Sequence, residues 1–293
     1  MLPSHGRYDF SPITKRKDYH WPNGARLALY VCLGIEEYVF GEGMVEDLVP
    51  GGSKPDLANT SWRDYGNRVG GFRLVDMFEQ FQIPLTVLLN TECYGHAPDL
   101  IDYARAKECE MVAHGLTNSD TLAEMDESQQ FAYIQSVINS MSKMEGKTPA
   151  GWCSPWLAHT DITIDIIKEL GFLYLLDLAM DDQPVWLKTR TSPLLHVPFS
   201  VEINDSSAIV GRLASASDFS TMIIDQFDEM LEASKQQPLV MCVVVHSFIS
   251  GQPFRLRALR RAMEHIFGHR DDVWLTTSGR IASFIAEQPD LAP

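Results

Sequence analysis

Short apolar runs alternate with segments of helical periodicity along the whole chain, and this alternation most constrains the fold. Strand-like runs rich in β-branched and aromatic residues cover residues 28–35, 83–90, 111–114, 172–176, 194–199, 238–246 and 273–277. Apolar residues at helical spacing cover residues 72–81, 98–107, 126–144, 160–170, 219–234, 255–267 and 278–286. Strands that alternate with helices form parallel sheets, so the pattern predicts an α/β fold, a barrel-like (β/α) domain with seven or eight strands.

The predicted domain follows an N-terminal arm. Residues 1–24 are rich in proline, glycine and charge, and no linker-like change of composition interrupts residues 25–293. A chain of 293 residues suits one large α/β domain. We expect a single catalytic domain over 25–293, with the arm and the tail 285–293 as candidates for subunit contacts.

Charge and cysteine content limit the classes of partner and the cellular compartment that we expect for this protein. A net charge of −15 and a pI near 4.9 argue against nucleic acid or an anionic membrane as partner. Five cysteines without CxxC spacing are typical of a reduced cytosolic protein. Since no signal peptide and no apolar run of about 18 residues is present, we expect a cytoplasmic protein that acts on a small ligand.

Chemically active side chains follow the predicted strands. Glu36 and Glu37 end the first run, while His114 and His246 end two later runs. Strand ends of a (β/α) barrel build its active site. Two adjacent carboxylates repel, which raises the proton affinity of one and suits it to acid or base catalysis. The alternative to a catalytic role is a solvated loop position for the two glutamates and a structural role for the two histidines.

A second group of residues forms candidate substrate contacts. The loop 151–156 carries two tryptophans, and aromatic residues beside polar groups wall small-molecule pockets as well as ordinary cores. The acidic turn after residue 176 is either a solvated turn or a binding element. The candidates are Tyr38, Arg68, Trp152, Cys153, Ser154, Trp156, Asp177 and Asp182.

The order of these motifs resembles the polysaccharide deacetylase family, a distorted (β/α) barrel of metal-dependent hydrolases, from about Trp21 to Phe284. That family ends a first strand in two aspartates, the catalytic base and then a metal ligand, where this chain has Glu36 and Glu37. Its second motif places two histidines on the metal, where this chain has His114 and Asn118. The loop 152–155 and the segment 244–246 match its later motifs.

At the positions where this chain departs from the family pattern, its residues are similar to those of the metal-independent allantoinases and cyclic imide hydrolases of this family. Losing one imidazole and lengthening one carboxylate disturbs a site whose ligands must lie about 2 Å from the metal. The resemblance therefore implies a cyclic imide hydrolase without a favoured cofactor. Zinc at Glu37 and His114 remains the alternative.

The resemblance also suggests roles. Glu36 is favoured as the base, while His114 and His246 orient water, polarise the carbonyl or donate the proton. A homo-oligomer, most simply a tetramer, is expected. The substrate stays open among succinimide or maleimide, hydantoin, dihydropyrimidine and allantoin. Competing hypotheses are an allantoinase, a metal-dependent N-deacetylase, and an inactive ligand-binding barrel.

Overall fold

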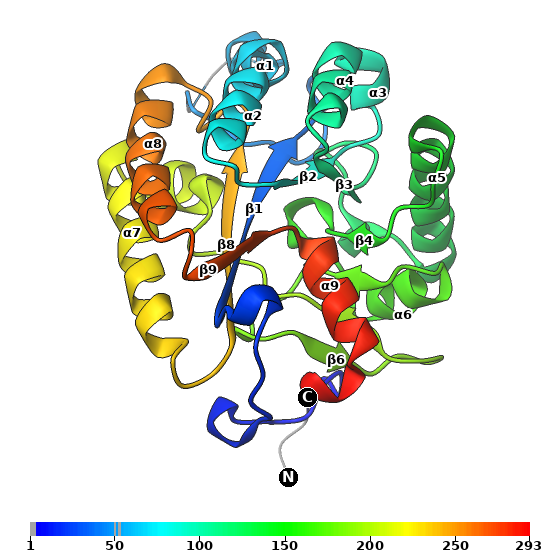
Figure 1. The fold of residues 1–293 in the computed structure, drawn as a ribbon. Coiled ribbons are helices and arrows are strands. Elements are labelled where there is room, and N and C mark those ends of the chain that lie inside the picture. Colours follow the sequence, from blue (N-terminus) through cyan, green and yellow to red (C-terminus); the bar gives the residue numbers. More distant parts are fainter. Residues whose placement is uncertain (1–3, 50, 52–53) are drawn as a thin grey trace.

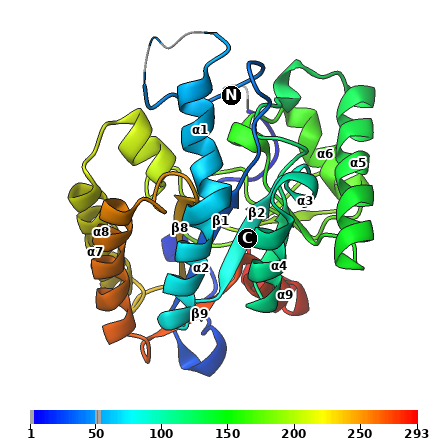
Figure 2. The ribbon, with the colours of Figure 1, turned by 90° about the horizontal axis from the view of Figure 1, so that it is seen from above.

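A computed structural model describes residues 4–49, 51 and 54–293. Within them nine strands form one curled sheet, and helices cover its outside (Figures 1 and 2). The strands are β1 (Leu27–Ile35), β2 (Leu85–Leu89), β3 (Glu110–Ala113), β4 (Gly151–Trp152), β5 (Tyr174–Leu175), β6 (Val185–Leu187), β7 (Leu194–His196), β8 (Leu239–His246) and β9 (Val273–Thr276). The helices are α1 (Leu57–Tyr65), α2 (Gly71–Gln80), α3 (Cys93–His96), α4 (Pro98–Ala106), α5 (Glu127–Glu145), α6 (Asp161–Glu169), α7 (Ala216–Ala233), α8 (Pro253–Gly268) and α9 (Ser278–Glu287).

The sheet is almost wholly parallel. Its strand order is β6-β7-β5-β4-β3-β2-β1-β8, and β9 pairs with the first half of β1. Only β6 and β7 are antiparallel to each other. Asn204, in the segment after β7, forms a single bridge to Val244 of β8, which brings the two ends of the sheet together. This arrangement confirms the distorted (β/α) barrel, with nine strands instead of seven or eight.

The longest strands form the centre of the domain. Every residue of β1 and β8 is buried, as expected for parallel strands covered on both faces by other elements. Their register pairs Gly34 with His246, and the register of β1 with β2 pairs Ile35 with Leu89. The carboxyl ends of β1, β2 and β8 therefore lie at the same edge of the sheet.

Most predicted elements agree with the structure to within a few residues. Helix α5 begins with a capping box, in which Asp126 accepts from Gln129 N–H and the Gln129 side chain accepts from Asp126 N–H. The predicted loop 151–156 instead begins with the short strand β4, and β6 was not predicted. Strands of two or three residues are too short to show a period; β5 and β7 could be predicted because they lie within longer apolar runs, whereas β4 and β6 do not.

The glycine-punctuated segment 64–71 is helical. A π-helical turn over Gly66–Gly70 joins α1 to α2, so one long helical stretch runs beside the end of β8. A Cβ on Gly70 would lie 2.0 Å from the Ser247 carbonyl oxygen, and one on Gly66 would lie 2.4 Å from Ser247 Oγ. These glycines allow the helix to approach the loop that follows β8.

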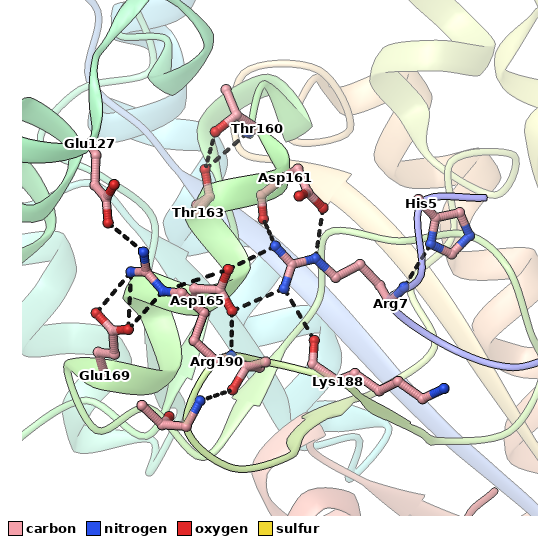
Figure 3. A network of polar contacts seen from close by, with 12 residues as sticks. His5, Arg7, Glu127, Thr160, Asp161, Thr163, Asp165, Glu169, Lys188 and Arg190 are labelled. Carbon is pink, nitrogen blue, oxygen red and sulfur yellow. Dashed lines mark hydrogen bonds and ion pairs between the residues drawn. The ribbon is translucent and has the colours of Figure 1, made fainter. Parts of the chain in front are cut away.

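The N-terminal arm packs against its own domain (Figure 3). Arg7 donates to both carboxylate oxygens of Asp165, at 2.9 and 2.8 Å, and to Asp161 at 2.6 Å. Lys188 N–H donates to the Arg7 carbonyl, and Trp186 N–H donates to the carbonyl of Pro293. Arm and C-terminal tail thus meet on the same β6 segment, whereas their predicted role in subunit contacts stays a prediction. No helix in the described part of the chain is long and apolar enough to cross a bilayer.

Candidate active site

The carboxyl ends of β1, β3 and β8 surround a cavity of about 200 Å³. Glu36 follows β1, His114 follows β3 and His246 ends β8, and all three line the cavity. Their convergence follows from the parallel register, which brings successive strand ends to one edge.

Glu36 lies at the centre of this group and is 3% exposed. Its Oε1 atom lies 3.5 Å from His114 Nε2 and 3.4 Å from His246 Nε2. Burial opposes ionisation, but the two imidazoles outweigh it and hold the pKa of the Glu36 carboxyl well below its usual range. The Glu36 side chain is therefore an anion throughout the neutral pH range.

The other carboxylate oxygen of Glu36 is fixed by two donors. Tyr38 O–H donates to Oε2 at 2.7 Å, and Asn118 Nδ2 donates to the same oxygen at 3.2 Å. Asn118 also donates to the Tyr38 hydroxyl oxygen at 2.9 Å. The resulting triangle of contacts holds the carboxylate in one orientation.

His246 is held by a buried aspartate that the sequence analysis missed. Asp205 Oδ1 lies 2.6 Å from His246 Nδ1, while its Oδ2 accepts from His246 N–H and from the Ser250 hydroxyl. Burial lowers the pKa of His246, but the Glu36 and Asp205 carboxylates outweigh burial and raise this pKa well above its usual value. The imidazolium form of His246 is thus available as a charged donor toward the cavity.

His114 is oriented by the backbone. Its Nδ1 lies 2.7 Å from the carbonyl oxygen of Cys153, which can only accept, so Nδ1 carries a proton. Its Nε2 then faces Glu36. The hydrogen bond on its far nitrogen thus fixes the direction of this imidazole ring.

Glu37 does not line the cavity, although the sequence analysis placed it in the catalytic set. Its carboxylate lies 3.4 Å from Asn67 Nδ2 and 3.5 Å from His96 Nδ1. Burial raises the pKa of Glu37, with a smaller increase from Asp64. The expected repulsion between the two adjacent glutamates is therefore not what sets either pKa.

The predicted substrate contacts divide into two groups. Cys153, Ser154 and Trp156 line the cavity, and Tyr38 contacts it through Glu36. Trp156 adopts a left-handed backbone conformation with φ of 57°, and its indole N–H donates to the Asn118 carbonyl at 2.5 Å. A non-glycine residue in this conformation stores strain of a kind that collects at functional sites.

The remaining candidates lie elsewhere. Trp152 is fully buried and packs on Phe172 in the core. Asp177 accepts from the N–H and hydroxyl of Ser154, so it positions the loop without reaching the cavity. Asp182 lines a separate cavity beside β8, and Arg68 is exposed outside the site cavity. Trp152 thus contributes to core packing and the buried Asp177 holds the loop. Substrate contact by Asp182 and Arg68 stays a prediction.

Sequence reasoning also missed Glu46, which lines the cavity from the long loop after β1. It lies in no strand or helix, so no period or motif marked it. One sequence feature could have identified Glu46: it is an acidic residue in an unusually long loop that directly follows a strand.

Gly34 provides a direct test of this geometry. A Cβ there would lie 2.9 Å from both Glu36 Oε1 and His246 Cδ2. We expect Gly34→Ala to lower kcat by about ten- to a hundredfold, because a displacement of about 1 Å at reacting groups has effects of that size. The melting temperature should change little, since the crowded atoms are side-chain ends. Gly95→Ala, with nothing within 4 Å of the added Cβ, is the matched control, and equal kcat values for both variants would contradict the prediction.

The positions expected to hold a metal do not converge. The Glu37 carboxylate is directed at Asn67 and His96, and Asn118 presents an amide N–H to Glu36 where the family pattern has an imidazole. Among the described residues, no three histidine, cysteine, aspartate or glutamate side chains form a ready metal-binding group. The residues present therefore do not fit the two-histidine metal site of the deacetylase family that the sequence resembles.

Comparisons with known proteins agree with the fold, and two solved structures match nearly the whole chain. The profile of the family described as Polysaccharide deacetylase matches residues 63–175. A probable polysaccharide deacetylase from Pseudomonas aeruginosa is 26% identical, with a TM-score of 0.83 over 93% of this chain and 95% of that chain. The Puue allantoinase is also 26% identical, with a TM-score of 0.84 over 96% of this chain and 99% of that chain. A peptidoglycan deacetylase from Helicobacter pylori is 22% identical over 77% of this chain and 87% of its own length.

Proposed function

Since this chain has the polysaccharide deacetylase fold and matches the family profile over residues 63–175, we propose that it hydrolyses a carbon–nitrogen bond in small cyclic amides. Cyclic imides such as succinimide or maleimide are the proposed substrate class, with ring opening to half-amides. Hydantoins and dihydropyrimidines are further candidate substrates, because they are also small rings with a cyclic amide bond.

One observation carries the proposal. Glu36 is shared by two imidazoles, while Asn118 replaces the imidazole that a second metal contact would need. An N-acetyl amide requires strong activation, whereas an imide nitrogen leaves as an anion stabilised by its remaining carbonyl. A site built from charged side chains suits the second reaction. The cavity of about 200 Å³ is also smaller than the pockets that hold drug-sized ligands, which favours a single small ring.

The proposed mechanism uses three side chains. Glu36 takes a proton from a water molecule, which attacks a ring carbonyl, and His114 orients that water. The His246 imidazolium, held by Asp205, donates to the carbonyl oxygen as negative charge develops. The C–N bond then breaks, and the ring nitrogen receives a proton. The product carries a carboxylic acid and an amide.

The proposal includes no resident metal, because the donor set described above does not fit one. Zinc at Glu37 and His114 stays the competing hypothesis, and it belongs to an N-deacetylase of the same family. An inactive ligand-binding barrel is the non-enzymatic alternative.

An allantoinase is the second candidate function. The structural similarity to the Puue allantoinase over almost the whole of both chains favours it. Allantoin carries a bulky side group on its ring, so cavity size distinguishes it from a plain imide.

The first test is a substrate panel on metal-stripped, metal-quantified enzyme. Succinimide, dihydrouracil, allantoin and an N-acetylated sugar oligomer are each assayed before and after zinc is returned. We expect succinimide to open without metal, at a rate unchanged by a chelator. Preference for allantoin would support the second candidate. Activity only with zinc, or only on the sugar, would overturn the proposal, and no turnover of any ring would favour the inactive barrel.

The proposed partners are a small substrate and further copies of the chain, without nucleic acid or membrane. A tetramer remains a prediction, and light scattering after size-exclusion chromatography measures it directly. We also propose a cytoplasmic location.

A further inference from the structure

Glu46 is buried, whereas the other residues of the loop segment 39–49 are exposed. Glu46 as a whole residue is 7% exposed, whereas Val45 on one side is 37% exposed and Asp47 on the other is exposed. Two contacts fix the loop here: Arg63 donates to the Glu46 carbonyl at 2.5 Å, and Met44 N–H donates to the carbonyl of Ser119 at 3.1 Å. The loop thus inserts one carboxyl group into the site cavity.

A hydroxyl group connects this carboxyl to Glu36. Tyr38 O–H donates to Glu36 Oε2 at 2.7 Å, and the same hydroxyl oxygen lies 3.5 Å from Glu46 Oε2. The Ser206 hydroxyl donates to the other oxygen of Glu46. Two carboxyl groups therefore line one small cavity, with a tyrosine hydroxyl between them.

The surroundings of the two carboxyl groups differ in charge. Glu36 meets two imidazoles, which favour its anion. Glu46 is buried near the Glu36 and Asp205 carboxylates, and both burial and these charges favour its protonated form. His246 and the Ser206 hydroxyl act in the opposite direction and favour its anion. Burial, followed by Glu36 and Asp205, raises the pKa of Glu46 to about 7. Paired carboxyl groups whose environments favour opposite protonation states are a signature of acid–base catalysis.

We propose that Glu46 is the general acid of the ring-opening reaction. This inference rests on the proposed function and adds the group that completes it. As the C–N bond breaks, the electron pair goes to nitrogen, and the Glu46 carboxyl gives its proton to that nitrogen. Glu36 holds the proton taken from water, and the Tyr38 hydroxyl returns it to Glu46. One water molecule is added across the bond and both carboxyl groups regain their starting states.

The first test compares Glu46→Gln with the wild-type enzyme on two leaving groups. Ring opening releases an amidate nitrogen from succinimide and a hydroxamate nitrogen from N-hydroxysuccinimide, both stabilised by the remaining carbonyl. The amidate is much the more basic of the two, so its departure depends more strongly on a proton from an acid. We expect kcat for succinimide to fall about a hundredfold or more, the usual scale for a positioned acid, and kcat for N-hydroxysuccinimide to fall much less. Glu42→Gln, the same substitution at an exposed position of the same loop, is the matched control and should keep wild-type rates.

The pH profile supplies an independent readout. Wild-type kcat on succinimide should decline as pH rises through about 7, because Glu46 then loses its proton. Glu46→Gln should lack that decline, and Glu46→Asp, which keeps an acid, should restore part of the rate. Tyr38, Arg63, Ser206, Glu36, Asp205 and His246 also face Glu46. Loss of the decline in Glu46→Gln would therefore assign this part of the pH profile to Glu46 itself.

The outcomes separate this inference from the function on which it rests. If wild-type enzyme opens no cyclic amide, the proposed function fails. If wild-type enzyme opens succinimide, but Glu46→Gln loses equal rates on both substrates or keeps the decline above pH 7, Glu46 is a structural residue and only this inference fails.

Discussion

Replacement of Glu36 by glutamine is expected to lower kcat for ring opening by at least about a hundredfold, the usual effect of removing a positioned base. Glutamine has nearly the same volume and keeps an oxygen for Tyr38 and Asn118, so the cavity should persist. It can neither accept a proton from water nor hold the two imidazoles by charge. The pKa of His246 should also fall, because the Glu36 carboxylate is a principal cause of its rise. Steady-state kinetics and imidazole titration by NMR measure both effects.

The adjacent residue supplies the comparison. Glu37→Gln changes the same chemical group one position along, but its contacts are Asn67 and His96 outside the cavity. Its loss of kcat should be at least tenfold smaller than that of Glu36→Gln. Equal losses would return Glu37 to the catalytic set, and a Glu36→Gln enzyme within a few-fold of wild type would remove Glu36 from it.

Replacement of Asp205 by asparagine should have the second large effect, a loss of kcat of about two to four orders of magnitude. Asp205 accepts from His246 at the ring and at the backbone, and an amide in its place can hold the wrong tautomer, a fault that costs about 10⁴ in serine proteases. Without this carboxylate the pKa of His246 falls, so the imidazolium is lost at lower pH. The alkaline limb that depends on His246 should therefore move to lower pH.

Ser250→Ala is the control for this variant. It removes one hydrogen bond from Asp205 Oδ2 but leaves the charge and the contact with His246 in place. We expect a change in kcat of a few-fold at most and an unshifted pH profile. If Asp205→Asn shifts neither the profile nor the rate beyond this control, His246 does not act as the charged donor.

Secondary structure could be predicted where the period was long enough. The nine residues of β1 and the first seven of β8 are continuous apolar runs, and α5 combines a clear period with a capping box at Asp126. Strands β4 and β6 were missed because they lie outside longer apolar runs, unlike the equally short β5 and β7. Gly66 and Gly70 resemble loop glycines in the sequence, although in the structure they allow close packing inside a helical stretch.

The site could be predicted in part for the same reason. Glu36, His114 and His246 directly end or follow strands, so the strand pattern alone brought them to one edge. Asp205 and Glu46 come from segments outside the strands. Only the path of the chain brings Glu46 to the cavity and Asp205 to His246. Strand-end position also could not distinguish Glu36 from Glu37, because the direction of each side chain depends on its partners.

The sequence by itself determined the alternation of strands and helices, and with it the barrel class and the edge where ionisable groups gather. These properties depend on local hydrophobic period, which each segment carries within a few residues. Tertiary structure decided which carboxylates face the cavity, which aspartate holds His246, and that Asn118 donates to Glu36. Those properties depend on distances between residues far apart in the chain, and the charge state of each group follows from its burial and its neighbours.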